Sequence, residues 1–332
     1  MENPPTRINQ TLLATALLEG YGFQVTRLEF LQRGWGGDCY RAETHAGESY
    51  FLKLHDTGPQ GAFAASSRDF YLPLMDQLFN QAILPHIPHP IYTQSGALSL
   101  AVGGRELVVT PFIQGELVGF GQMYQEVMAQ FADLVGTLHA SLPRLSFEHP
   151  FIERFEIAFE PALRAHLAAL DAITPQHGPG MQRLQAALLP RREEVYQALE
   201  RLKTLQTRAR VTQPSMVVCH TDLHGDNLMR DEQGNLYLLD WENAMIAPRE
   251  HDMIFFAGEG PAVWDVFWPV YQRHFPGVQL DPHLLAFYFH RRGLEDIADF
   301  LVRIAQGDGG PQRDQEDLEE LLDILDGLAS LE

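Results

Sequence analysis

The sequence predicts an α+β fold in which a small, β-rich N-terminal lobe precedes a larger, mainly helical lobe. In the first ~110 residues, short apolar runs alternate with glycine-bearing turns, as expected for strands. After residue 114 the apolar residues recur at helical spacing instead. The 332 residues suffice for two lobes. We therefore expect lobes of residues 1–113 and 114–332, with a connector at the end of the first.

The N-terminal lobe is expected to contain both strands and helices. Residues 9–19 should form a helix that Gly20 and Gly22 end. A second helix is expected over residues 62–79, where Pro73 should break or kink it. The expected strands are residues 24–31, 39–43, 50–54, 97–102 and 107–110.

The second lobe begins with the clearest amphipathic pattern in the chain, over residues 123–140, where Val127, Phe131 and Leu138 share one side. Two apolar, strand-like runs follow later, at residues 216–219 and 236–239. Further helices are expected at residues 160–173, 182–207, 282–304 and 317–331.

The net charge restricts the classes of partner. Forty-four acidic residues against 24 basic residues give a net charge of −20, which disfavours nucleic acid and anionic membranes. Such a surface attracts cationic ligands, although a requirement for solubility would explain the charge equally well. Part of it lies in an acidic stretch at residues 314–326.

Other features indicate a cytoplasmic protein. No apolar stretch approaches the ~20 residues that a membrane helix needs. The N-terminus has no basic region followed by an apolar segment, so no secretory signal is expected. The two cysteines, Cys39 and Cys219, lie far apart and outside metal-type spacing, which indicates reduced thiols.

The most informative motif is the segment at residues 220–227, with a second acidic motif at residues 238–241. Asp222 is followed by Asn227 and then by Asp240, in a loop–strand–loop arrangement flanked by the two strand-like runs. Phosphoryl transfer needs a carboxylate that receives the proton of the acceptor hydroxyl, and oxygen ligands for Mg²⁺. We therefore expect Asp222 to be catalytic and Asn227 and Asp240 to bind the metal.

Simpler roles exist for these side chains, because Asp and Asn also favour turns and caps. His220 and His224 could in principle share a zinc ion. Gly225 and the preceding strand indicate a loop here, however, and a helix would be needed to bring the two rings together. We expect His220 to brace the loop through the backbone or through the second metal-binding carboxylate.

The N-terminal lobe offers nucleotide-binding residues in a matching order. Lys53 lies in an apolar strand, where its ammonium group needs a partner, and the α- and β-phosphates of ATP would provide one. An edge-strand lysine facing solvent is the alternative. Gly34, Gly36 and Gly37 precede this strand and could let backbone amides approach phosphates, although an ordinary hairpin would look the same.

This order of features resembles the aminoglycoside phosphotransferase family, and within it the spectinomycin phosphotransferases. The pattern H-x-D-x-H-x-x-N matches His220, Asp222, His224 and Asn227, and an Asp–aromatic pair matches Asp240 and Trp241. The resemblance extends through the proline-containing run at residues 247–252 and the segment at residues 290–298. It implies a protein-kinase-like bilobal fold, Mg²⁺ with ATP or GTP, and a structural role for a buried Asp252.

Two departures from kinase-like enzymes are evident. The strand lysine usually pairs with a Glu on the next helix, but residues 62–79 contain only Asp69 and Asp76 as acids. The second metal motif also lacks the glycine of D-F-G, so no activation switch of the protein-kinase type is implied.

The connector is expected to contact the nucleotide through Thr110, Phe112 and Ile113.

The resemblance suggests a small cationic acceptor, such as an aminocyclitol. Carboxylates and one aromatic ring could recognise its ammonium groups. The candidates are Asp226, Trp241, Glu242, Glu295, Asp296 and Asp299. Each could equally be a surface residue, and Glu295 and Asp299 have the spacing of a solvated helix face.

Three functions follow from the sequence. The first is O-phosphorylation of an aminoglycoside-like antibiotic, led by spectinomycin, which would confer resistance. The second is the same chemistry on a metabolite such as homoserine, choline, a sugar or a thioribose. The third is a nucleotide-binding pseudokinase or a protein-directed kinase. The complete Asp222–Asn227–Asp240 set disfavours a dead enzyme.

Overall fold

The structure is a computed structural model that describes residues 8–34, 37–56, 59–119, 121–257, 260–307 and 310–330. The chain divides into two compact units. The first comprises Met1–Ile152 and Met216–Val278, and the second comprises Glu153–Ser215 and Gln279–Glu332. The lobe boundary expected near residue 114 is a different division, within the first unit, and it stays a prediction.

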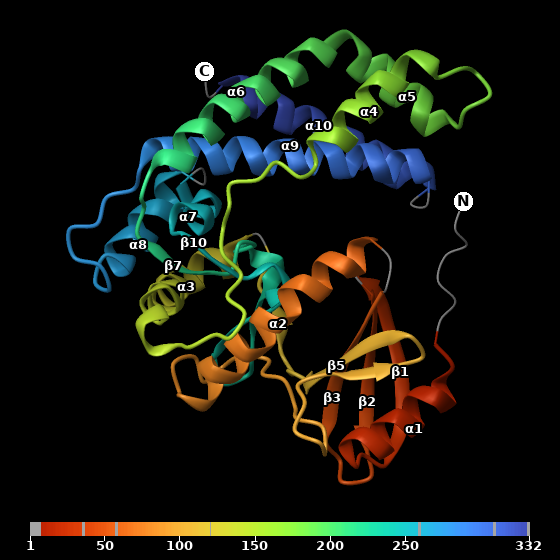
Figure 1. Ribbon diagram of the computed structural model, residues 1–332, viewed down its shortest axis with the longest axis vertical. Helices are drawn as coiled ribbons and strands as arrows, with labels where there is room; N and C mark the ends of the chain where they lie inside the picture. The colour runs from red at the N-terminus through yellow and green to blue at the C-terminus, as the bar shows by residue number, and fades with distance from the viewer. Residues whose placement is uncertain are drawn as a thin grey trace. The chain divides into compact units, whose positions relative to one another are not determined.

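A five-stranded antiparallel sheet forms the N-terminal part of the first unit (Figure 1). Its strand order is β1-β2-β3-β5-β4. The strands are β1 (Val25–Gly34), β2 (Gly37–Thr44), β3 (Ser49–His55), β4 (Leu100–Val102) and β5 (Arg105–Pro111). All five expected strands are present, with β4 shorter than the expected 97–102.

Helix α1 (Gln10–Tyr21) covers one face of this sheet. Asn9 caps it by accepting the amide hydrogen of Thr11, and Gly22, with φ of 76°, ends it as expected. Alternate residues of the sheet pack against α1 in a shared apolar core, among them Tyr40, Leu52 and Val109.

The opposite face of the sheet carries the intervening residues, because side chains alternate along a strand. Cys39 pairs in register with Lys53, and Lys53 pairs with Val108. Phe51 and Thr110 form the next pair along the same face. The sheet thus presents the predicted phosphate-binding lysine on the face away from α1.

The rest of the first unit contains the catalytic loop and its supports. Helix α2 (Pro59–Asn80) continues through Pro73, so the expected break does not occur. Strands β7 (Met216–Cys219) and β10 (Met245–Pro248) pair antiparallel, as do β6 (Glu116–Leu117), β8 (Leu228–Arg230) and β9 (Leu236–Leu238) in the order β6-β8-β9. The remaining helices are α3 (Gln122–Ala140), α7 (Glu250–Ala257) and α8 (Pro261–Tyr271), with 3₁₀ turns η1 (Leu142–Arg144), η4 (Gly225–Asn227) and η5 (Trp241–Asn243).

The described part of the second unit is helical. It contains α4 (Glu160–Ala169), η2 (Leu170–Ala172), α5 (Pro179–Leu188), η3 (Leu189–Arg191), α6 (Arg192–Val211), α9 (Pro282–Gln306) and α10 (Gly310–Ser330). The single helix expected at residues 182–207 is two, because Pro190 interrupts it. Helix α9 lies against α6 and α10 (Figure 1), and Arg303 joins α9 to Asp317 of α10 through two hydrogen bonds of 2.9 and 2.8 Å.

This arrangement confirms the α+β fold with a small antiparallel sheet and a mostly helical remainder. Among the helices of the described residues, none combines the length and apolar character needed to cross a lipid bilayer.

Candidate active site

The loop that carries Asp222 is fixed by a buried carboxylate. Asp252 of α7 accepts the amide hydrogen of His220 at 3.0 Å and that of Thr221 at 2.6 Å. Thr221 has a φ of 75°, in the left-handed region that non-glycine residues rarely occupy. The structural role expected for Asp252 is confirmed, because its side chain is completely buried and defines the backbone course into Asp222.

Asp252 is itself held by a buried hydrogen-bond chain. The Nε2 of His139 lies 2.9 Å from Oδ2 of Asp252, and its Nδ1 lies 2.8 Å from the hydroxyl of Tyr271. Arg249 donates to the same hydroxyl oxygen at 2.9 Å. Burial lowers the pKa of His139, so a neutral ring donates to Asp252 and accepts from Tyr271.

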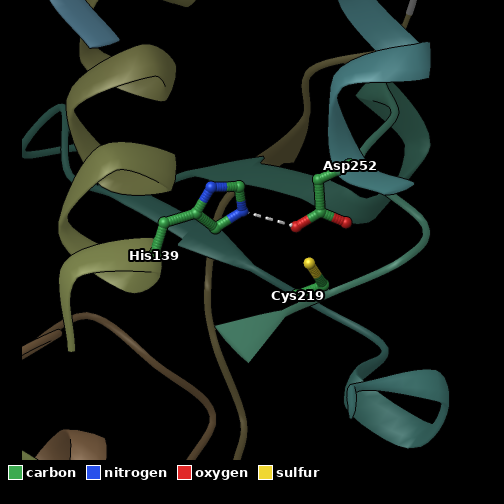
Figure 2. A group of neighbouring side chains, drawn as sticks. All are labelled: His139, Cys219 and Asp252. Atoms are coloured by element: carbon green, nitrogen blue, oxygen red, sulfur yellow. Dashed lines mark hydrogen bonds and ion pairs between the residues drawn. The ribbon is translucent and has the colours of Figure 1, made fainter. Parts of the chain in front are cut away.

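The ligand atoms of His139, Cys219 and Asp252 all lie within 4.8 Å of one another, which is a grouping that could hold a metal ion (Figure 2). The Cys219 thiol points to backbone carbonyls, with Sγ 3.4 Å from the oxygen of Pro248. Since His139 and Asp252 also have hydrogen-bond partners at the same atoms, the cluster is explained as a support for the loop.

Asp222 lies at the start of the loop with its carboxylate partly exposed. Its Oδ2 accepts a hydrogen bond from Nδ2 of Asn227 at 2.8 Å, and its backbone carbonyl accepts from the same nitrogen at 2.9 Å. The Nε2 of His224 lies 3.2 Å from the same Oδ2. These contacts fix the orientation of a carboxylate that solvent can still reach.

The two predicted metal ligands are brought together by the β8–β9 hairpin. Leu228 pairs with Leu238, and the amide of Leu239 donates to the carbonyl of Asn227 at 2.8 Å, so Asn227 and Asp240 leave the hairpin side by side. The Nδ2 of Asn227 is turned toward Asp222, which places its Oδ1 on the other side of the amide. The side chain of Asp240 is half exposed. Amide and carboxylate oxygens are ligand types that suit Mg²⁺, whose coordination phosphates and water would complete.

His220 braces this hairpin. It is completely buried, and its Nε2 donates to the carbonyl of Leu239 at 2.8 Å. Its ring packs edge-on against Trp241 with 5.0 Å between centroids. The expected backbone bond is therefore confirmed, and the zinc alternative has no support, because His220 and His224 make separate contacts.

Lys53 reaches the same group of charges from β3. Its Nζ lies 3.4 Å from Oδ1 of Asp240 and forms a closer ion pair with Glu242. Burial opposes the ammonium form, but the carboxylates of Asp240 and Glu242 outweigh it and raise the pKa of Lys53. Burial, together with the charge of Asp240, raises the pKa of Glu242. The partner of Lys53, which the sequence left open, is thus in the loop after β9.

The glycine-rich hairpin joins β1 to β2, where Gly34 pairs with Gly37. Gly36 lies outside the described residues. Gly37 has to be a glycine, because a Cβ there would lie 2.2 Å from the carbonyl oxygen of Leu54. Asp38 is buried beside it, and its Oδ2 lies 2.7 Å from Nη1 of Arg105. The Nη2 of Arg105 donates to the carbonyl of Leu54. Sequence reasoning missed this anchor, since neither residue belongs to a recognisable motif.

The expected connector follows β5. Thr110 is buried near the end of that strand, and the amide of Phe112 donates to the carbonyl of Ser49 at 3.0 Å. The guanidinium of Arg41 lies 4.5 Å from the centroid of the Phe112 ring. Ile113 comes next in the connector. Nucleotide contacts at Thr110, Phe112 and Ile113 remain predictions.

The candidate acceptor-binding residues are divided between the units. In the first, Asp226 is exposed, whereas Glu242 is engaged with Lys53. Trp241 is a correction: it is buried and its Nε1 donates to the carbonyl of Leu238 at 2.7 Å, so no open ring face is presented to an acceptor.

The second unit holds the other three acids, on α9. Asp296 pairs with Arg292 at 3.0 Å. Burial and the neighbouring charges of Glu295 and Asp296 raise the pKa of Asp299 to about 6. Glu295 is exposed, yet partial desolvation by the surrounding protein raises its pKa as well. Arg291 and Arg292 offset part of this acidic charge, because both act to lower the pKa of Glu295.

Comparison with known proteins agrees with this geometry. Residues 27–288 match the model of the phosphotransferase enzyme family. No protein with curated annotation has significant similarity to the chain. Among solved structures, a spectinomycin phosphotransferase in complex with ADP and spectinomycin is similar, with a TM-score of 0.73, 18% identity and 98% of each chain covered.

Two further similar structures are kinases of small amines by name. Choline kinase LicA from Streptococcus pneumoniae has a TM-score of 0.55 and 16% identity, with 97% of this chain and 99% of that chain covered. A microcompartment-associated aminopropanol kinase has a TM-score of 0.64 and 12% identity, with 96% and 95% covered. At these identities the similarity establishes the fold.

Proposed function

The chain belongs to the phosphotransferase enzyme family, and from this premise we propose that it moves the γ-phosphate of ATP or GTP to a hydroxyl of a small cationic molecule. That the protein is a phosphotransferase acting on hydroxyl groups follows from the family and from its kinase neighbours. The nucleotide, the metal and the acceptor are the proposed part.

The observation that carries the proposal is the contact between Asp222 and Asn227. It orients the Asp222 carboxylate through Oδ2, while a backbone bond from Leu239 to Asn227 brings the residue before Asp240 next to Asn227. In this role Asp222 would align the acceptor hydroxyl and take up its proton, a contribution worth ~10²–10⁴-fold in rate. Asn227 and Asp240 would hold Mg²⁺, which neutralises developing charge on the phosphates.

Lys53 completes the set from the N-terminal sheet. Its raised pKa keeps the ammonium group charged at neutral pH, as a partner for phosphate oxygens requires. Because it already lies 3.4 Å from Asp240, a nucleotide bound through the metal would find the lysine beside its phosphates.

Two observations support a cationic acceptor. The net charge of −20 favours the encounter with cations, and burial with the charges of Glu295 and Asp296 raises the pKa of Asp299 on α9, an effect that a bound cation would offset. The similarity to a structure holding spectinomycin makes an aminocyclitol antibiotic the first acceptor to test. The choline and aminopropanol kinases make a metabolic amino alcohol the second.

The test is Mg²⁺-dependent consumption of ATP and GTP with a panel of acceptors. The panel contains spectinomycin, several aminoglycosides, choline, aminopropanol, homoserine and methylthioribose, and Asp222→Ala is the control. We expect turnover with one cationic acceptor that the variant loses. Turnover only with an uncharged acceptor would overturn the cationic class, and no stimulation by any acceptor despite nucleotide binding would favour a protein-directed or regulatory role.

A further inference from the structure

We propose that Glu242, in the loop after β9, is the residue that positions the predicted phosphate-binding lysine, Lys53. Kinase-like enzymes usually use a glutamate on the helix after β3 for this purpose. The inference rests on the proposed function, in which Lys53 contacts nucleotide phosphates. It assigns Glu242 to the nucleotide, whereas the sequence had suggested the acceptor.

The contact between the two side chains is close and sheltered. Lys53 and Glu242 each keep only 17% of their side-chain surface exposed. The second contact of Lys53, with Asp240, is longer at 3.4 Å, and the Asp240 side chain is 50% exposed. When Asp240 binds a metal ion, its charge is shared with that ion, and Glu242 is then the carboxylate left to hold the ammonium group.

Helix α2 offers no replacement. Its sequence contains no glutamate. Asp69 is exposed, and Asp76 accepts a hydrogen bond from Asn80 at 2.8 Å, so neither is directed to Lys53. The basic residue of α2, Arg68, acts electrostatically on His55 and Tyr71.

His55 does not compete for Glu242. It lies two residues after Lys53 on the same face of β3, with Nε2 3.8 Å from Glu242 and 3.3 Å from the hydroxyl of Tyr71. Burial and the positive charges of Lys53 and Arg68 lower its pKa to about 3. A neutral imidazole leaves Lys53 as the cation that Glu242 neutralises.

The turn that carries Glu242 is rigid. Trp241 is buried and bonded to Leu238, the amide of Ala244 donates to the carbonyl of Trp241, and Thr221 donates to the carbonyl of Asn243 at 3.1 Å. One turn therefore holds both the predicted metal ligand and the lysine's partner.

The first experiment compares Glu242→Gln with the wild type in steady-state kinetics. The substitution keeps the shape and removes the charge. Losing a hydrogen bond to a charged group should raise the KM for ATP about tenfold to a hundredfold, with the KM for the acceptor and the Mg²⁺ dependence unchanged. Glu232→Gln, on an exposed turn, is the matched control. A raised acceptor KM or a raised Mg²⁺ requirement would overturn the proposal.

The second experiment tests whether Glu242 acts through Lys53. If it does, adding Glu242→Gln to Lys53→Met should cost no further ATP affinity, measured calorimetrically with Mg-ADP so that no acceptor is needed. Additive losses would assign Glu242 an independent role. If Lys53→Met alone leaves Mg-ADP affinity unchanged, the proposed role of Lys53 fails, which is a separate result.

The reactivity of Lys53 toward a labelling reagent can also be measured directly. Its sequence contains two lysines, Lys53 and Lys203. Lys203 is 42% exposed and lies 3.6 Å from Glu160 and from Glu200. In Glu242→Gln the ammonium group of Lys53 loses its closer ion pair, so an amine-acylating reagent followed by mass spectrometry should label Lys53 several-fold faster, with Lys203 as the internal reference. Unchanged labelling of Lys53 would contradict the assignment.

Discussion

The Nδ2 of Asn227 lies 2.8 Å from Oδ2 of Asp222, so the amide nitrogen of one predicted metal ligand orients the predicted base. The acceptor hydroxyl and the nucleotide phosphates would therefore be positioned by a single loop. Since proximity and alignment supply much of the acceleration in phosphoryl transfer, the loop is where substitutions should affect turnover most.

Replacing Asp222 should abolish turnover and spare nucleotide binding. Asp222→Ala is expected to lower kcat by about 10²–10⁴-fold, because proton transfer to the carboxylate assists chiefly in the transition state. Mg-ADP affinity, measured by calorimetry, should change little. An equal loss of nucleotide affinity would instead assign Asp222 to the metal or to the structure.

Replacing Asp240 should weaken Mg-nucleotide binding. Asp240 has a φ of 59°, and asparagine tolerates this left-handed backbone, so Asp240→Asn changes the charge with little added strain. Removing a carboxylate ligand should lower the apparent Mg²⁺ affinity at least about tenfold. Calorimetric titration of Mg-ADP checks this, and unchanged affinity with retained Mg²⁺ dependence would contradict the role.

Replacing Asp252 should destabilise the first unit. Asp252→Ala leaves two buried amides and His139 without their acceptor, which should lower the free energy of unfolding by about 3 kcal/mol or more. The four tryptophans, Trp35, Trp241, Trp264 and Trp268, all belong to that unit, so tryptophan fluorescence during urea unfolding reports on it. Asp69→Ala, at an exposed site, is the control. Equal midpoints for the two variants would refute the prediction.

Stability should fall as the pH drops below about 6.5. His55 has a pKa of about 3 in the folded protein against 6.5 unfolded, so below 6.5 the unfolded chain binds the extra proton. The loss from this residue should reach about 1.4 kcal/mol at pH 5.5 and continue toward pH 3. His55→Gln can still bond Tyr71. In urea unfolding followed between pH 8 and 5, its free energy of unfolding should vary less steeply with pH, with about 1.4 kcal/mol less loss at pH 5.5 than in the wild type. An unchanged slope would show that His55 titrates normally.

Much of the site could be predicted because its parts are close in sequence. Asp222 and Asn227 precede one short hairpin and Asp240 follows it, so their spacing in the sequence is enough to predict that they act together. The partner of Lys53 could not be found this way, since 187 residues separate Lys53 from Asp240 and only the folded chain brings them together. Glu242 lies two residues after Asp240, and the sequence alone does not distinguish a contact with the acceptor from the contact with Lys53 that the fold brings about.

The errors in the fold have similar causes. Helix α7 was not predicted, because most of its side chains are buried and no polar face marks its period. Pro190 marks the break between α5 and α6, whereas the helical spacing of residues 182–207 alone predicts one helix. Pro73, by contrast, lies within a continuous α2. Intrinsic preference for a break can thus be outweighed by the packing of the flanking turns.

The backbone of Thr221, in the loop that carries Asp222, is strained in a way that lowers the stability of the folded protein. A glycine at this position would adopt the left-handed backbone without strain, but it would lose the hydroxyl that bonds Asn243 and so ties the loop of Asp222 to the turn of Glu242. In Thr221→Gly the relief of backbone strain and the loss of this hydrogen bond therefore oppose one another, and the strained backbone of Thr221 is retained together with the bond that holds the two loops.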